Sequence, residues 1–207
     1  MKVVTLNHVL HTLKHRIYDH PFVFYFVIGA IFLVLNSLLF FDAEQRDKRG
    51  RTLLYLAAEK GDVSQVKSLL GKVAHPDQRD DCKWTPLMRA AQNGHLEVST
   101  LLLISGANVN AVDKGGYSVL MVASANKNPA ILKLLIHHDA DLNLQDPGLG
   151  WTAFIWAAKE GHYENVKILL DAGSDVSIMD KTGKSAMDWA RENNHWKIAG
   201  FLQSLDS

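Results

Sequence analysis

The sequence predicts an all-α protein, in which a solenoid of stacked helical repeats follows an amphipathic helix and one transmembrane helix. Three observations predict this fold class. A block that begins with Thr or Ser recurs five times at steps of 33, 33, 34 and 33 residues. Residues 22–41 contain no charged side chain, and residues 1–20 carry apolar side chains at helical spacing. The three segments are justified below in chain order.

Residues 1–20 predict an amphipathic helix. Their apolar side chains recur at alternating steps of three and four, which places them on one face of a helix. These are Val3, Leu6, Leu10, Leu13 and Ile17, and the opposite face carries His8, His11, Lys14 and His15. One interpretation is a helix that lies at a membrane interface or docks on a partner. The other is a short tail that orders only weakly in water.

Residues 21–41 predict a single-pass membrane anchor, with the lipid bilayer as a partner. At about 1.5 Å per residue, the uncharged run spans roughly 30 Å, the thickness of a hydrocarbon core. A buried core helix is the alternative. Lys and Arg are more numerous on the C-terminal side, which favours a cytoplasmic repeat domain. The expected anchor side chains are Phe22, Phe24, Phe26, Ile31, Leu33, Leu35, Phe40 and Phe41.

After a short linker at 42–49, residues 50–207 predict one repeat domain. Its five blocks start at Thr52, Thr85, Ser118, Thr152 and Ser185. In the second block, small Ala90 and Ala91 let the first helix approach its neighbours, and Gly94 suits the left-handed end of that helix. The second helix is expected to bury Leu96, Val98, Leu101 and Leu102. Because no block buries its own apolar face, stacking must create one continuous core.

The motifs "TPLMRAAQNGHLEV", "LLLISGANVNA" and "GHYENVKILLDAGSDVS" are specific. Through them, residues 47–207 resemble the ankyrin-repeat family. The resemblance implies two helices and a projecting hairpin tip in each repeat, with repeats at about 47–79, 80–112, 113–146, 147–179 and 180–207. Two departures are local: Leu53 replaces the usual Pro in the first repeat, and Lys127-Asn128 replaces Gly-His in the third.

Composition and motifs predict no catalytic, cofactor-binding or metal-binding residue. The formal net charge is zero, so there is no electrostatic case for nucleic acid. Cys82 is the only cysteine, which excludes an internal disulfide. His95, His162 and His195 occupy equivalent repeat positions, and side chains that repeat along a stack do not converge on one ion. We therefore expect neither an enzyme nor a small-molecule substrate.

The residues that the repeat pattern leaves free are expected to bind a protein partner. By resemblance, the variable surface positions lie one residue before each Thr/Ser start and four residues after it. Four of the five Trp residues fall there, and aromatic and Arg side chains dominate protein interfaces. Packing within the stack is the alternative. The expected partner-binding residues are Trp84, Arg89, Tyr117, Trp151, Trp156 and Trp189.

Together these features predict a membrane-anchored adaptor that serves as an accessory or assembly subunit of a membrane-associated complex. Its expected partners are proteins, themselves associated with the membrane. The alternatives are a regulatory or ligand-sensing subunit of a channel or transporter, or a secreted bacterial effector.

Overall fold

The computed structural model describes residues 29–30, 45–71 and 75–205. The chain divides into two units, Met1–Asp42 and Ala43–Ser207. Of the first unit, Gly29 and Ala30 are described, and both are helical. The features below belong to the second unit.

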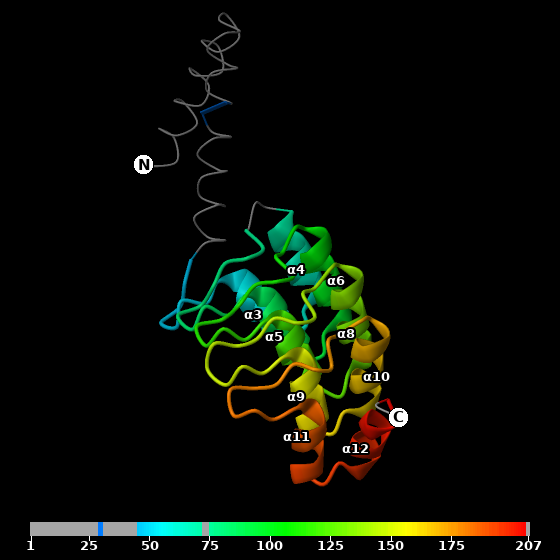
Figure 1. Ribbon diagram of the computed structural model, residues 1–207. Helices are drawn as coiled ribbons and strands as arrows, with labels where there is room; N and C mark the ends of the chain where they lie inside the picture. The colour runs from blue at the N-terminus through cyan, green and yellow to red at the C-terminus, as the bar shows by residue number, and fades with distance from the viewer. Residues whose placement is uncertain (1–28, 31–44, 72–74, 206–207) are drawn as a thin grey trace, which may run out of the picture. The chain divides into compact units, whose positions relative to one another are not determined.

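The second unit is a stack of five helix pairs (Figure 1). The first helices of the pairs form one row, the second helices form another, and the loops between pairs project together on one side. The described residues contain isolated bridges but no strand, so the all-α prediction is confirmed for this part of the chain. The pairs are α3 (Leu53–Lys60) with α4 (Val63–Leu70), α5 (Pro86–Gln92) with α6 (Leu96–Ile104), α7 (Val119–Ser124) with α8 (Pro129–His137), α9 (Ala153–Lys159) with α10 (Tyr163–Asp171), and α11 (Ala186–Glu192) with α12 (Trp196–Gln203).

The recurring Thr or Ser is the N-cap of each first helix. Its side-chain oxygen accepts a hydrogen bond from the backbone N–H three residues later, which would otherwise lack a partner in the helix. The Thr85 Oγ1 to Met88 N distance is 3.2 Å, and Thr152 repeats it with Ile155. Gly94 follows α5 with φ +80°, a conformation that costs Gly little. These caps explain why the five blocks begin where they do.

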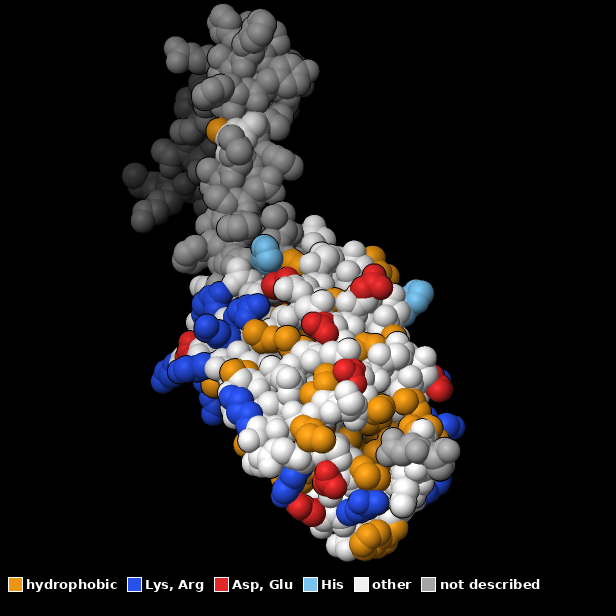
Figure 2. All heavy atoms as spheres, in the orientation of Figure 1, with side chains coloured by type: hydrophobic (Ala, Val, Ile, Leu, Met, Phe, Trp, Pro, Cys, Tyr) orange, Lys and Arg blue, Asp and Glu red, His pale blue; other side chains and the backbone are white. Residues whose placement is uncertain are grey.

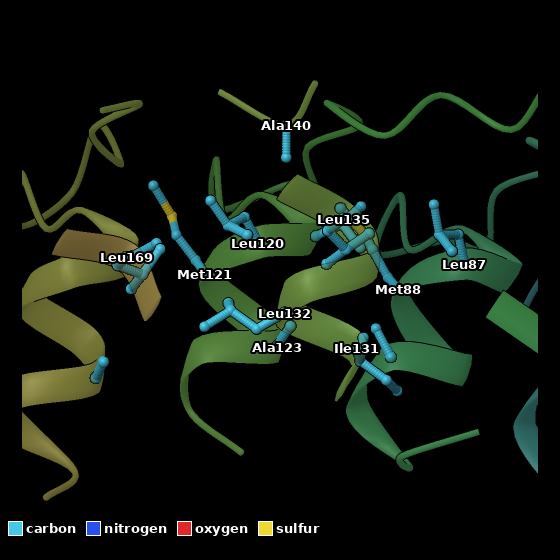
Figure 3. Close-up of a cluster of buried hydrophobic side chains, with 14 of the residues drawn as sticks. Leu87, Met88, Leu120, Met121, Ala123, Ile131, Leu132, Leu135, Ala140 and Leu169 are labelled. Atoms are coloured by element: carbon cyan, nitrogen blue, oxygen red, sulfur yellow. The ribbon is translucent and has the colours of Figure 1, made fainter. Parts of the chain in front are cut away.

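One hydrophobic core runs through the stack, and Figure 3 shows a part of it between α5 and α10. Ala90 and Ala91 are buried as expected, and so are Val98 and Leu102 of α6. The expectation for Leu96 is wrong, because that side chain is 41% exposed. Leu96 lies two positions before Val98, and two positions turn a helix by about 200°, so the two side chains face opposite ways. The partly buried Leu101 packs against the edge of the core.

The structure corrects the predicted membrane localisation. Among residues 29–30, 45–71 and 75–205, no helix has the length and apolar character to cross a bilayer. The longest described helices have nine residues and reach about 14 Å. This finding contradicts the single-pass assignment. The predicted amphipathic helix and the anchor side chains from Phe22 to Phe41 lie outside the described residues.

Candidate protein-binding groove

A pocket of about 340 Å³ opens between the second, third and fourth repeats. Its volume lies in the range of ordinary ligand sites. Trp84 and Tyr117 enter it from the loops before α5 and α7, and Trp156 enters it from α9. The remaining lining residues lie on or just after first helices: Gln92, Met121, Val122, Ala125 and Asn126. We call these eight residues the groove pocket.

In the loops before α5 and α7, an aspartate positions the aromatic residue that follows it by four positions. Asp80 Oδ1 accepts a hydrogen bond from the backbone N–H of Trp84 at 2.9 Å. Asp113 Oδ1 accepts one from the backbone N–H of Tyr117 at the same distance. These side-chain-to-backbone bonds close the turn, as Asp commonly does in loops. The projecting turns are called tips below: residues 45–51, 79–84, 112–117, 145–151 and 179–184.

The indole N–H groups link successive tips. Trp84 Nε1 donates to Asp113 Oδ2 at 3.0 Å, and Trp151 Nε1 donates to Asp180 Oδ2 at 3.0 Å. Both bonds join residues 29 positions apart, so the same contact occurs in the second and in the fourth repeat. In the first repeat, Tyr55 Oη does the same work by donating to Asp80 Oδ2 at 2.8 Å. Aromatic donors therefore tie α3 to the second tip, the second tip to the third, and the fourth tip to the fifth.

Tyr55 and Asp180 show how burial and hydrogen bonding act on these links. Burial raises the pKa of Tyr55 to about 12, so its hydroxyl keeps the proton that it donates. Burial alone would also raise the pKa of Asp180. Hydrogen bonds from Thr182, the Lys184 backbone and two indoles outweigh burial, and they hold the pKa of Asp180 far below its ordinary value.

The aromatic side chains of the later repeats form one cluster. Tyr117 meets Trp156 edge-on at 5.8 Å between ring centres, and Trp156 meets Trp151 at 4.8 Å. Trp151 then meets Trp189 at 5.1 Å. Such edge-to-face pairs add stabilisation beyond the buried area. The cluster ends at Tyr117, and the groove pocket separates it from Trp84.

Cations lie over the outer aromatic rings. The Arg89 guanidinium is 4.6 Å from the ring centre of Trp84, and the Lys159 ammonium is 5.7 Å from that of Trp156. Each cation also pairs with a glutamate: Arg89 with Glu59 at 3.5 Å and Lys159 with Glu160 at 2.8 Å. The rings of Trp84 and Trp156, which line the groove pocket, therefore each already interact with a cation of the chain.

The structure separates the six predicted partner-binding residues into two groups. Trp84, Tyr117 and Trp156 line the groove pocket together, and Arg89 covers Trp84. Trp151 is only 7% exposed, and the partly buried Trp189 packs against it. Both indoles donate to Asp180, Trp189 at 2.9 Å, so the same hydrogen bonds that join the tips also hold these two rings inside the stack.

Sequence reasoning missed part of the lining of the groove pocket. Val122 stood at a position expected to be variable, yet its small size gave no signal of function. Gln92 and Asn126 lie at the far ends of first helices, seven and eight residues after their starts. A signal was present there, because each of these polar residues directly follows an Ala at the end of a first helix.

The repeated histidines connect neighbouring repeats. His95 Nε2 lies 3.1 Å from the carbonyl oxygen of Glu59, and His162 Nε2 lies 2.9 Å from that of Ala125. In the third repeat, Asn128 stands where the second, fourth and fifth repeats have His, and its Nδ2 donates to the carbonyl oxygen of Gly94 at 3.3 Å. An amide thus replaces an imidazole as the link between repeats. The described part of the chain contains no group of three or more His, Cys, Asp or Glu residues placed to hold a metal ion.

Comparisons with known proteins match this architecture. A family model described as ankyrin repeats in three copies matches residues 28–113 and 116–206. The chain is 43% identical over 53 residues to the NAD-capped RNA hydrolase NUDT12 of Homo sapiens, and the proteins of Pongo abelii and Macaca fascicularis match equally. This similarity covers 26% of the chain and 12% of the length of those relatives.

Proposed function

Because this chain belongs to the ankyrin-repeat family, we propose that it is a protein–protein interaction adaptor whose groove pocket receives a side chain of its partner. In this proposal the chain is an accessory or assembly subunit of a multiprotein complex.

The observation that carries this proposal is the groove pocket itself. Three partly exposed aromatic residues from three different repeats surround about 340 Å³ of space with mostly apolar walls. Aromatic side chains around a cavity are the usual centre of a protein interface, because they bury a large area and lose little conformational entropy. The repeat scaffold fixes their spacing through the caps and the indole links.

The hydrolase similarity does not carry an activity to this chain. It covers 12% of the length of those relatives, and the catalytic action in their name belongs to the whole proteins. In the described residues of this chain, the perturbed carboxylates are explained by hydrogen bonds that hold tips and caps. The adaptor function rests on the groove pocket and on the family.

Site-directed photocrosslinking tests the proposal. A benzophenone amino acid at Val122 would lie in the groove pocket, whereas the same amino acid at Ile104 would lie on α6, where the native side chain is 73% exposed. We expect irradiation of cells that express the full chain to give discrete crosslinked products from position 122 only. Equal products from both positions, or none from position 122, would contradict a groove-binding adaptor.

A further inference from the structure

The first three tips carry an excess of positive charge. They contain seven Lys or Arg residues against four Asp residues, a net charge of about +3, whereas the last two tips contain two of the former and two of the latter. Figure 2 shows Lys and Arg side chains along the edge where the tips project. The positive excess is therefore confined to the end of the tip row that carries Trp84 and Tyr117.

Of the four aspartates in these tips, only Asp47 forms an ion pair with a described cation. Asp80 and Asp113 use both carboxylate oxygens internally, on backbone N–H groups and on aromatic donors. Asp47 forms an ion pair with Arg51 at 2.7 Å. Asp81 is the remaining acid. Among the described residues, six cations of these tips form no ion pair: Arg46, Lys48, Arg49, Arg79, Lys83 and Lys114.

On the two tips that supply the groove pocket, this set contains Arg79, which donates to the carbonyl oxygen of Val112 at 2.7 Å, and the lysines Lys83 and Lys114. Lys83 immediately precedes Trp84, and Lys114 lies three residues before Tyr117. Both side chains are exposed. The backbone N–H of Lys114 donates to the carbonyl oxygen of Cys82 at 2.9 Å, so the two tips lie side by side. The two tips that supply Trp84 and Tyr117 to the groove pocket therefore also carry exposed lysines that form no ion pair among the described residues.

The interior of the groove pocket disfavours a cationic occupant. Aromatic walls can bind ammonium groups, which makes a methylated lysine the obvious competitor. Arg89 already lies over the ring of Trp84, and Lys159 over that of Trp156. No acidic residue lines the groove pocket. A further cation would meet two positive charges, and the carboxylates nearest to them, Glu59 and Glu160, are already engaged in ion pairs with Arg89 and Lys159.

We propose that the partner is an acidic protein segment with one large apolar side chain. The apolar side chain fills the groove pocket, and flanking Asp or Glu residues face Lys83, Lys114 and the basic first tip. This inference rests on the proposed function and adds the chemistry of the partner to it. Electrostatic complementarity of this kind mainly raises the association rate and selects against basic partners.

A selection from random 12-residue peptides displayed on phage tests the proposal. The bait is the full chain, and two variant baits accompany it. Val122→Trp fills the groove pocket with a neutral ring, and Ile104→Trp places the same ring on the outer face of α6. We expect the wild-type and Ile104→Trp baits to enrich peptides with Leu, Phe or Trp flanked by Asp and Glu. The Val122→Trp bait loses this enrichment.

Charge reversal then tests the two lysines, Lys83 and Lys114. Lys83→Glu/Lys114→Glu is compared with Lys127→Glu/Lys133→Glu, which makes the same change in net charge at exposed residues of the third repeat outside the tips. With one enriched peptide labelled with fluorescein, we expect the tip variant to bind about tenfold or more weakly and the control to bind within about twofold. Thermal unfolding of both variants checks that the stack is intact.

Other outcomes separate this inference from the proposed function. Enrichment that depends on the groove pocket but yields basic or uncharged peptides would overturn the acidic partner and leave the adaptor in place. Tighter binding of a synthetic trimethyllysine peptide than of the acidic peptide would do the same. Identical pools from the wild-type and Val122→Trp baits, or no enrichment at all, would count against both.

Discussion

Trp84 and Trp151 occupy the same position of two repeats, yet they end in different surroundings. Each stands one residue before the N-cap of a first helix, and each donates its indole N–H to the tip aspartate of the next repeat at 3.0 Å. Trp84 is partly exposed and lines the groove pocket. Trp151 is 7% exposed and contacts two other indoles.

The difference arises from the residue that the next repeat places four positions after its start. After Trp84 this residue is Val122, which leaves open space, and after Trp151 it is Trp189, which packs against the ring at 5.1 Å. The residue four positions after the start of the same repeat differs as well, Arg89 in one case and Trp156 in the other. An identical residue in an identical repeat position is therefore open or packed according to its neighbours.

The largest effect is expected from truncating the packed ring. Trp151→Ala would leave a cavity in the aromatic cluster and remove one donor from Asp180. We expect the free energy of unfolding to fall by about 3–5 kcal/mol, measured by urea denaturation. Trp84→Ala is the matched variant, with an expected loss of about 1–2 kcal/mol because that ring is partly exposed. Equal losses at the two positions would contradict the comparison.

Removing the charge beneath the packed indoles should have the next largest effect. Asp180→Asn weakens the acceptor for both indole N–H groups, and we expect a loss of about 2 kcal/mol at neutral pH. Hydrogen bonds hold the pKa of Asp180 in the folded chain below its unfolded value. The stability contributed by the carboxylate is therefore complete above the unfolded pKa of about 3.9, and it is lost as the pH falls through the lower folded value.

The pH dependence provides a separate measurement of this prediction. Melting temperatures from pH 7 to pH 2 should fall less steeply on the acid side for Asp180→Asn than for the wild type. Asp171→Asn, which changes an exposed carboxylate at the end of α10, serves as the control and should follow the wild type. If the melting temperatures of the wild type and Asp180→Asn fall equally as the pH is lowered, the Asp180 carboxylate does not cause the loss of stability in acid.

A smaller effect is expected when only the indole N–H of the open ring is lost. Trp84→Phe keeps an aromatic wall in the groove pocket but removes the hydrogen bond to Asp113. We expect a loss of about 1 kcal/mol in chemical denaturation, since the bond is charge-assisted but partly exposed to solvent. A change as large as that of Trp84→Ala would show that the hydrogen bond, and not the ring, ties these two tips together.

The smallest effect on stability is expected from making the open region resemble the packed one. Val122→Trp places an indole beside Trp84, just as Trp189 lies beside Trp151. The site is partly exposed, so we expect the free energy of unfolding to change by less than about 0.5 kcal/mol. The new indole should cover Trp84, which is partly exposed in the wild type, and acrylamide should therefore quench the tryptophan fluorescence less. A loss of more than 2 kcal/mol would mean that the groove pocket is too tight to accept a ring.

Local signals in the sequence predicted much of the fold. The Thr/Ser residues were predicted to start the repeated blocks, and the structure shows that they cap the first helices. Gly94 is left-handed, and Ala90 and Ala91 are buried, as expected. Each of these features depends on contacts within a few residues. The buried face of α6 was predicted less well, since Leu96 and Val98 lie on opposite sides of a short helix. Trp84, Tyr117 and Trp156 were identified as candidate site residues, and the structure brings these three together at one pocket.

The sequence by itself thus determined the repeat, its helices and the positions that the repeat leaves variable. Only the tertiary structure decided which variable residues remain open. Trp151 and Trp189 stand 38 residues apart, and so do Trp84 and Val122, so no local pattern reports whether the second side chain fills the space beside the first. In a solenoid, burial at such a position depends on the size of a neighbour one repeat away. That size is large in one region and small in the other, and the groove pocket is the result.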